Sequence, residues 1–446
     1  MNGIGPPGSA ADLAAIDVRL AGNPGDRVSW HNRGVELRRL DRPEEALAAL
    51  ERAWGGGLRA PETAMMRGHV LADLGRFDEA ERAYRHAIAA RPDLVDAQVA
   101  LATLLPQLGR PDEALDGFRD ALARAPQTGA LWVAAMQAAQ GHGDHPQLLA
   151  FADAAEARFG PDTLVTTHAA IALSALGRDA EAYARLDRAL DAEPDFAPGH
   201  AAMARILLRL GEPAQAAAAA MAANRLAPDE QSGWALLSTA WRVLGDPRED
   251  WLCRYEALVM ELEVELPAGL TAALEKRHHT RSAPADQSLR GGTQTRGQLF
   301  ESGEPAVLAL ANTLAAGIET RLAQLPKDET HPFLARNTGA IAFSASWSVR
   351  LASNGFHVSH MHPSGWLSSA LYIALPEEVR DSETQGALTF GVPDAGLGLD
   401  LPPRRVVRPE IGRLVLFPSY LWHGTTPFES AEHRLTVAFD ALPRRS

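Results

Sequence analysis

The chain has 446 residues, which is too long for one ordinary hydrophobic core, because a single core rarely grows past about 250 to 300 residues. Its 43 Lys and Arg against 56 Asp and Glu give a formal net charge of -13, which disfavours binding to nucleic-acid phosphates or to anionic lipid. We therefore expect two domains, no nucleic-acid partner and no membrane partner.

The N-terminal residues and the single cysteine bear on where the protein works. The first residues, MNGIGPPGSAADLAA, lack the basic stretch and the apolar run of a secretory signal. No stretch approaches about 18 consecutive apolar residues, so no transmembrane helix is predicted. The lone Cys253 cannot form an intrachain disulfide, and its apolar surroundings favour a small buried side chain. We expect a cytoplasmic protein.

A repeat with a period of 34 residues runs through the first half of the chain. Its clearest markers are the glycines Gly75, Gly109, Gly143, Gly177, Gly211 and Gly245. Small residues keep the same step at Gly68 and Ala102, and large aromatic residues keep it at Tyr84 and Phe118. Small residues let paired helices approach closely, and glycine permits the positive φ of a helix C-terminus. The pattern predicts an all-α solenoid of about seven helical hairpins over residues 27–250, after a lead-in over 1–26.

These repeats resemble the tetratricopeptide family. Pro106 inside an expected first helix, and the unusual pattern of residues 131–160, predict a bend or a break of register near residues 106–160. The resemblance implies a concave surface that binds an extended peptide or a partner helix, with homodimerisation as an alternative role. By repeat register, the candidate groove residues are Met65, His69, Arg205, Thr239 and Arg242.

Residues 251–300 are expected to be a connecting helix and a loop. Apolar residues keep helical spacing from Trp251 to Lys276, and the polar, turn-rich stretch that follows favours a loop. Within residues 301–446, a helix over 305–325 should precede a set of short strands rich in β-branched and aromatic residues. These strands are AIAFSASWSVRLAS, LSSALYIAL, GALTFGV, RLVLFPS and RLTVAFDAL. Short strands without intervening helices favour an antiparallel sandwich or barrel, jelly rolls included.

Histidines concentrate in the stretch GFHVSHMHPSGWLSSALYI and return much later in LFPSYLWHGTTPF. His360 and His362 are two residues apart, so on an extended segment they face the same side and can approach one metal ion. His423 would complete the site from a distant strand. Neutral imidazole suits Fe, Zn, Cu and Ni, and three protein ligands leave open positions for a substrate or O2. His357 is three residues from His360 and would face away.

The order H-x-H-P, SSALYI, GALTF, GRLVLFPSYLWH and R-L-T resembles the 2-oxoglutarate- and iron(II)-dependent oxygenases, which have a double-stranded β-helix (jelly-roll) fold. The likeness covers about residues 340–443 and is to the oxygenase domains that bacteria often append to tetratricopeptide repeats. It implies an α+β jelly-roll domain that uses Fe(II), 2-oxoglutarate and O2. Carried over, the first metal ligand is His360 and the distal ligand is His423.

Such enzymes usually have a carboxylate two positions after the first histidine, where this chain has His362. One alternative is a site with three imidazoles, which we favour. The other is a two-histidine site like that of the aspartyl/asparaginyl hydroxylases, which also follow a tetratricopeptide segment. Trp366 and Trp422 flank the ligands and are expected to shape the pocket wall.

Arg434 stands eleven positions after His423, where the resemblance implies an arginine that forms a bidentate pair with the distal carboxylate of 2-oxoglutarate. Thr436 shares the face of Arg434, and Ser369 and Tyr372 are candidate supporting contacts. The predicted function is a dioxygenase that hydroxylates a protein or peptide bound by the repeats. The alternatives are an inactive repeat scaffold and a cupin-like metal enzyme that does not use 2-oxoglutarate. A buried arginine beside the metal would argue against the cupin-like enzyme, because such an arginine needs an anionic partner.

Overall fold

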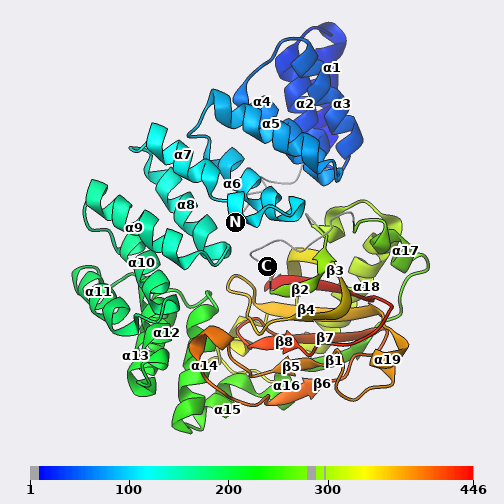
Figure 1. Ribbon diagram of the computed structural model, residues 1–446. Coiled ribbons are helices and arrows are strands. Elements are labelled where there is room, and N and C mark those ends of the chain that lie inside the picture. Colours follow the sequence, from blue (N-terminus) through cyan, green and yellow to red (C-terminus); the bar gives the residue numbers. More distant parts are fainter. Residues whose placement is uncertain (1–9, 279–287, 296–297, 445–446) are drawn as a thin grey trace. The chain divides into compact units, whose positions relative to one another are not determined.

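The computed structural model describes residues 10–278, 288–295 and 298–444 (Figure 1). The chain divides into two compact units, one built mainly from residues up to His142 and the other mainly from Gly143 onward. The second unit therefore contains both the later helices of the repeat array and the strand-rich domain. No helix in the described ranges is long and apolar enough to cross a membrane.

The helical array begins in the first unit. Its helices are α1 (Ala10–Gly22), α2 (Arg27–Arg39), α3 (Pro43–Gly55), α4 (Pro61–Asp73), α5 (Phe77–Ala90), α6 (Val95–Leu104), α7 (Asp116–Arg124) and α8 (Gly129–Gly141), with 3-10 turns η1 (Leu105–Leu108) and η2 (Pro111–Glu113). The predicted solenoid is confirmed, because the helices follow the 34-residue period. Every marker glycine has a positive φ, from 67° to 78°, and Asp41, one period before Gly75, also has a positive φ of 52°.

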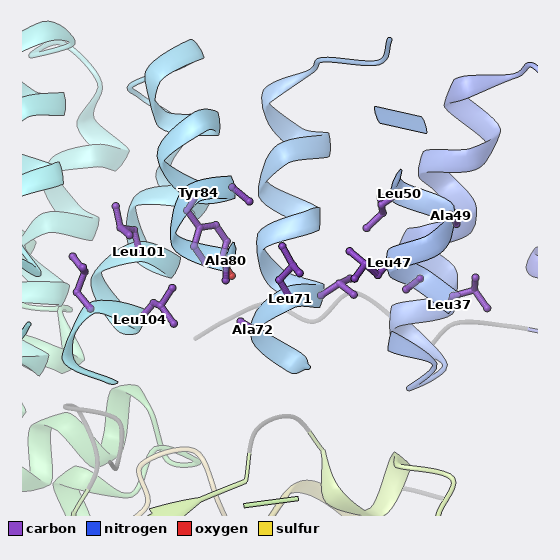
Figure 2. Close-up of a cluster of buried hydrophobic side chains, with 14 of the residues drawn as sticks. Leu37, Leu47, Ala49, Leu50, Leu71, Ala72, Ala80, Tyr84, Leu101 and Leu104 are labelled. Carbon is purple, nitrogen blue, oxygen red and sulfur yellow. The ribbon is translucent and has the colours of Figure 1, made fainter. Parts of the chain in front are cut away.

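A buried apolar layer joins successive helices of this unit, as Figure 2 shows for Leu37, Leu50, Leu71, Tyr84 and Leu104. Gly68 of α4 packs directly against Tyr84 of α5, and a Cβ at Gly68 would lie 2.5 Å from the Tyr84 ring. The small residue is therefore required for the two helices to approach this closely. The aromatic ring fills the space that the glycine leaves.

The array loses its regularity at Pro106, as the sequence predicted. Helix α6 ends at Leu104, and the next four residues form the 3-10 turn η1. Proline has no N–H for the helical ladder, and its ring clashes with the preceding turn. The second helix of this repeat, α7, begins only at Asp116 and has 9 residues.

The remaining helices belong to the later repeats and to the strand-rich domain. They are α9 (His145–Phe159), α10 (Thr163–Ala175), α11 (Asp179–Ala192), α12 (Ala197–Arg209), α13 (Pro213–Leu226), α14 (Ser232–Leu244), α15 (Arg248–Cys253), α16 (Tyr255–Leu258), α17 (Leu270–Glu275), α18 (Pro305–Leu322) and α19 (Glu377–Arg380), with 3-10 turns η3 (Leu299–Glu301), η4 (Leu334–Arg336) and η5 (Ala395–Leu397). Helix α18 confirms the helix predicted before the sheet. It buries Leu310, Leu314 and Ile318 at helical spacing and contacts β3.

Two antiparallel sheets form the strand-rich domain. The described strands are β1 (Met260–Glu263), β2 (Leu289–Gln294), β3 (Ile341–His357), β4 (Leu367–Ala374), β5 (Leu388–Phe390), β6 (Arg405–Val407), β7 (Arg413–Pro418), β8 (His423–Thr425) and β9 (Arg434–Pro443). The larger sheet has the order β1-β7-β4-β9-β3-β2, and the smaller has the order β6-β5-β8. This arrangement is consistent with the predicted jelly roll.

The connecting segment differs from its prediction. We expected one helix from Trp251 to Lys276, but strand β1 interrupts this stretch and pairs with β7, with Met260 opposite Leu416. Strand β2, from the expected loop, pairs with β3. Both edges of the larger sheet therefore come from the connector. A short segment such as MELE is compatible with either period, and the distant strand that pairs with it decides the outcome.

Candidate metal centre and anion pocket

His360 and His423 lie directly opposite each other in an antiparallel bridge beside the smaller sheet. The backbone N–H of each donates to the carbonyl oxygen of the other over 2.9 Å. Opposed residues of an antiparallel pair project their side chains to the same side, and the two ring centroids are 4.2 Å apart. His362 is anchored near them, because its N–H donates to the carbonyl oxygen of Ser419 over 3.0 Å.

The three imidazole rings are oriented by acceptors behind them. The Nδ1 atoms of His360 and His423 each lie 2.9 Å from a backbone oxygen, of Val358 and Leu421 respectively. The Nδ1 of His362 lies 2.6 Å from Asp440 Oδ1. An acceptor for one ring N–H fixes the tautomer and leaves the other nitrogen free to bind a metal.

The other ring nitrogens converge. One ligand atom from each of His360, His362 and His423 lies within 4.8 Å of the others, and the Nε2 atoms of His360 and His362 are 3.2 Å apart. His357 lies next to this cluster and does not face away from it, because its ring centroid is 6.0 Å from that of His360. Ser288 Oγ lies between the two rings, 3.0 Å from His357 Nδ1 and 3.2 Å from His360 Nε2. The arrangement supplies three imidazole donors on one side of a metal-sized space.

Asp440 is a site residue that the sequence analysis missed. Strand β9 presents Arg434, Thr436 and Asp440 on one face, because they are separated by even numbers of residues. The Ser368 hydroxyl, from the opposing position on β4, also donates to Asp440 Oδ1 over 2.7 Å. The even spacing from Arg434 within RLTVAFDAL was the only signal that could have identified Asp440.

The electrostatics of the cluster favour neutral rings at two positions. Burial, followed by the neighbouring His362, lowers the pKa of His360 to about 3. Burial and the neighbouring histidines hold the pKa of His423 well below its ordinary value. Burial also acts to lower the pKa of His362, but the Asp440 carboxylate outweighs it and raises that pKa. His360 and His423 are therefore ready to bind metal at neutral pH, whereas a metal must compete with a proton at His362.

Arg434 forms the second part of the site. Its side chain is 2% exposed, and Nη1 donates to the carbonyl oxygen of Gly386 over 2.9 Å. Among the described residues, Nε of Arg434 and the hydroxyl of the buried Tyr372 have no hydrogen-bond partner. The Arg434 guanidinium carbon is 5.8 Å from the Tyr372 ring centroid. Two unpaired donors in one buried place are costly unless an anion satisfies them.

The other two predicted pocket residues have different placements. Thr436 is buried and pairs with Tyr372 across β4 and β9. Ser369 lies on the opposite face of β4, where its hydroxyl donates to the Phe439 carbonyl oxygen and accepts from the Phe439 N–H. This placement ties Ser369 to strand pairing and does not support the prediction that it contacts the cosubstrate.

The two tryptophans that flank the ligands in the sequence donate their indole hydrogen bonds to other parts of the second unit. Trp366 stacks on Phe333 with ring centroids 4.6 Å apart, and its indole donates to the Phe333 carbonyl oxygen. The Trp422 indole donates to Thr239 Oγ1 of α14 over 2.9 Å. Trp347 lies beside the cluster instead, with its ring centroid 5.8 Å from that of His362.

Three of the five candidate groove residues are occupied by the chain itself. Arg205 forms an ion pair with Asp394 over 2.7 Å, and Arg242 donates to the carbonyl oxygens of Gly391 and Pro402. Thr239, as described above, accepts from Trp422. The prediction that these three line an open groove is therefore wrong. Segments of the same chain occupy this face, since covalent tethering gives them a high effective concentration there. Met65 and His69 of α4 are half-buried, and His69 Nδ1 lies 2.9 Å from the Tyr84 hydroxyl.

The fold and the site together define a protein with a tetratricopeptide array followed by an antiparallel sheet domain that carries a three-histidine cluster. Residues 345–440 match the family model described as "Putative 2OG-Fe(II) oxygenase", and residues 71–139 match a tetratricopeptide repeat model. Both resemblances stated from the sequence are therefore confirmed.

Comparison with solved structures identifies tetratricopeptide proteins. One is from Parabacteroides merdae, with 17% identity over 51% of this chain and 90% of that chain and a TM-score of 0.35. Another is YrrB, described as a TPR protein with an unusual peptide-binding site, with 17% identity over 50% of this chain and 97% of that chain and a TM-score of 0.29. Yeast Tom70 has 14% identity over 54% of this chain and 59% of that chain, with a TM-score of 0.35. No curated protein matched the sequence.

Proposed function

We propose that this protein is a 2-oxoglutarate- and Fe(II)-dependent dioxygenase that hydroxylates a side chain of a protein or peptide. The observation that carries the proposal is the presence, in one domain, of three convergent imidazoles and a buried arginine with an unpaired Nε. The imidazoles suit Fe(II), and the guanidinium suits a carboxylate. A metal enzyme without an anionic cosubstrate would leave the Arg434 donor unsatisfied.

The donor set fits both groups. His360, His362 and His423 would hold Fe(II) from one side and leave positions open for other ligands. Arg434, with Tyr372 and Thr436 beside it, would hold the distal carboxylate of 2-oxoglutarate. The match of residues 345–440 to the oxygenase family supports the same assignment.

When bound together, Fe(II), 2-oxoglutarate and O2 supply the oxidising power that converts a substrate C–H to C–OH, with release of succinate and CO2. The chain's own residues bind and orient these groups. The Asp440 carboxylate holds the proton on His362 Nδ1 and so keeps Nε2 available. Phe417, with its ring centroid 4.5 Å from that of His423, covers one side of the site and limits access of water.

A protein or peptide substrate is proposed because the chain carries a repeat array. Tetratricopeptide arrays present inner faces that suit extended peptides, and such a face raises the local concentration of a bound segment. Helices α12 and α14 already contact the strand-rich domain, so other first helices must supply the partner surface. Met65 and His69 on α4 remain candidates for it.

The test uses the full-length protein, purified without oxygen and loaded with Fe(II). Calorimetry should detect 2-oxoglutarate binding only after the metal is added, together with a weak visible charge-transfer band. Mass spectrometry of the host proteome after incubation should then find peptides that gain one oxygen atom only when 2-oxoglutarate is present. Absence of 2-oxoglutarate binding to the Fe(II)-loaded protein would contradict the proposed activity. Turnover of a free small molecule alone would instead reassign the repeats to assembly or homodimerisation.

A further inference from the structure

Trp422 and His423 are consecutive residues whose side chains contact two different parts of the second unit. The backbone here is extended, with His423 paired to Phe390 in the smaller sheet, so consecutive side chains point to opposite sides. His423 faces His360, and Trp422 faces helix α14 of the last repeat. The distal histidine of the cluster is thus adjacent in sequence to a contact with the repeat array.

The Trp422 contact is buried and specific. The indole is 6% exposed and donates to Thr239 Oγ1 over 2.9 Å and to the Ala235 carbonyl oxygen over 3.1 Å. The Thr239 hydroxyl donates its own proton to the Ala235 carbonyl oxygen over 3.0 Å, so it is free to accept from the indole. A buried indole N–H must find an acceptor, and α14 supplies it.

A second contact from the same helix reaches the main chain beside His423. Arg242 of α14 donates to the carbonyl oxygen of Gly391. The N–H of Gly391 in turn donates to the carbonyl oxygen of Trp422 over 2.9 Å. Helix α14 therefore holds Trp422 through its side chain and, by way of Gly391, through its backbone.

The position of β8 explains why such support is needed. This strand has 3 residues and stands at the end of the order β6-β5-β8. On its outer side it is held by the His360 bridge and by the His357 N–H, which donates to Thr425 Oγ1 over 2.9 Å, and by no further strand among the described residues. Short edge strands are weakly restrained by their own sheet. A metal ligand, however, must be held close to its productive geometry by the residues around it.

We propose that the last repeat helix is a structural part of the metal centre: Thr239 and Arg242 of α14 are positioning residues that set the geometry of His423 through Trp422. This inference rests on the proposed function, because it concerns the same three histidines. It gives the later repeats a role in the oxygenase domain that is separate from substrate binding.

The test compares two threonine variants in the full-length protein. Thr239→Val removes the nearer of the two acceptors for the Trp422 indole, leaves the Ala235 carbonyl oxygen, and keeps the side-chain shape. Thr103→Val is the matched control, because Thr103 stands at the same repeat position four periods earlier and has the same helical bond, to the Val99 carbonyl oxygen over 2.9 Å. Anaerobic calorimetry measures Fe(II) affinity, and the visible spectrum of the Co(II)-loaded protein reports ligand geometry.

We expect Thr239→Val to weaken Fe(II) binding by about 10-fold and to shift the Co(II) bands, because loss of ligand support typically costs about 10- to 100-fold in affinity. Thr103→Val should match the wild type in both. Trp422→Phe removes the indole N–H, which is the donor of the same hydrogen bond, and should give the result expected of Thr239→Val. It serves as the test if Thr239→Val folds poorly.

Three outcomes overturn the inference and differ in what else they affect. Wild-type Fe(II) affinity and Co(II) spectra in both Thr239→Val and Trp422→Phe would overturn the positioning role and leave the proposed function intact. An equal loss in Thr103→Val would assign the effect to general destabilisation of the repeats. A wild-type protein that binds neither metal would overturn the proposed function together with this inference.

Discussion

His362 and Asp440 form a hydrogen-bonded pair, with 2.6 Å between Nδ1 and Oδ1, in which the carboxylate stands behind the imidazole. The sequence resemblance implies oxygenases that place a carboxylate at the position of His362 and bind the metal with it. Here a histidine takes that position. The carboxylate, that of Asp440, contacts the Nδ1 side of this histidine instead of the space where the three imidazoles converge. Ser368 donates to the same Asp440 oxygen over 2.7 Å and fixes its orientation.

This pair predicts the effect of two substitutions on metal binding. His362→Ala should weaken Fe(II) binding nearly as much as His360→Ala or His423→Ala, because each removes one of three donors. Asp440→Asn should keep the hydrogen bond but lose the charge, at a cost of about 10- to 100-fold in Fe(II) affinity. Calorimetry under anaerobic conditions measures both, with His433→Ala, at an exposed histidine, as the control. Full Fe(II) binding in His362→Ala, with loss in the other two, would establish a two-histidine site instead.

The buried arginine predicts a selective loss of cosubstrate binding. Arg434→Ala should leave Fe(II) bound but raise the 2-oxoglutarate Kd by about 10- to 100-fold, since hydrogen bonds to charged groups contribute about 1.5 to 3 kcal/mol. Arg434→Lys should fall between, because an ammonium group cannot form the bidentate pair. Titration of the charge-transfer band gives the Kd values. An unchanged Kd in Arg434→Ala would remove this residue from the pocket.

Ser369→Ala is the matched control for the arginine variants. Its hydroxyl bonds only the Phe439 backbone among the described contacts, so the 2-oxoglutarate Kd should stay at the wild-type value. The free energy of unfolding should fall by about 1 kcal/mol, because strand-bridging hydrogen bonds are lost. A higher Kd without any loss of stability would return Ser369 to the cosubstrate site.

His331 predicts a loss of stability on acidification. It is fully buried, its Nε2 lies 2.9 Å from the Leu252 carbonyl oxygen, and its Nδ1 accepts from the N–H groups of Phe333 and Leu334. Burial lowers the pKa of His331 below its ordinary value of 6.5. Below about pH 6.5 the unfolded chain therefore binds a proton that the folded chain does not, and the free energy of unfolding falls.

Thermal unfolding of the metal-free protein at about pH 7.5 and about pH 5.5 tests this linkage. The drop in Tm between these two conditions should be smaller in His331→Gln than in the wild type, although the variant is less stable at the higher pH. The comparison isolates His331 because the other histidines are common to both proteins. The same drop in both would show that His331 does not contribute to the pH dependence.

The contacts of α14 predict which shortened chains fold. A chain beginning at Gly143 keeps the whole second unit from that residue onward and should fold and bind Fe(II). A chain beginning at Trp251 loses the acceptor for Trp422 and the Glu249 carboxylate that pairs with Arg404 over 2.8 Å. It also exposes apolar surface that α14 covers, so it should aggregate or unfold. Circular dichroism and size-exclusion chromatography distinguish the two. A soluble Trp251 chain with wild-type Tm would contradict the contribution of α14.

The sequence by itself determined the elements whose signals are local and periodic. The 34-residue step of the glycines predicted the solenoid, since each glycine has the positive φ of a helix end. The spacing of His360 and His362 predicted that the two rings share a side, because side chains alternate along an extended segment whichever strand pairs with it. Arg434 and Thr436 were assigned to one face of a strand for the same reason.

Only the tertiary structure decided which distant residues meet. Nothing local placed Asp440 behind His362, recruited Met260–Glu263 as an edge strand, or brought Trp422 to Thr239 of α14. Each depends on strand pairing or on the docking of a helix against a sheet, and these contacts join residues far apart along the chain. A period of two or of 3.6 residues predicts which face a side chain occupies, but not what packs against that face. Here the residues that pack against it, Asp440 behind His362 and Thr239 against Trp422, determine how the histidines of the cluster are held.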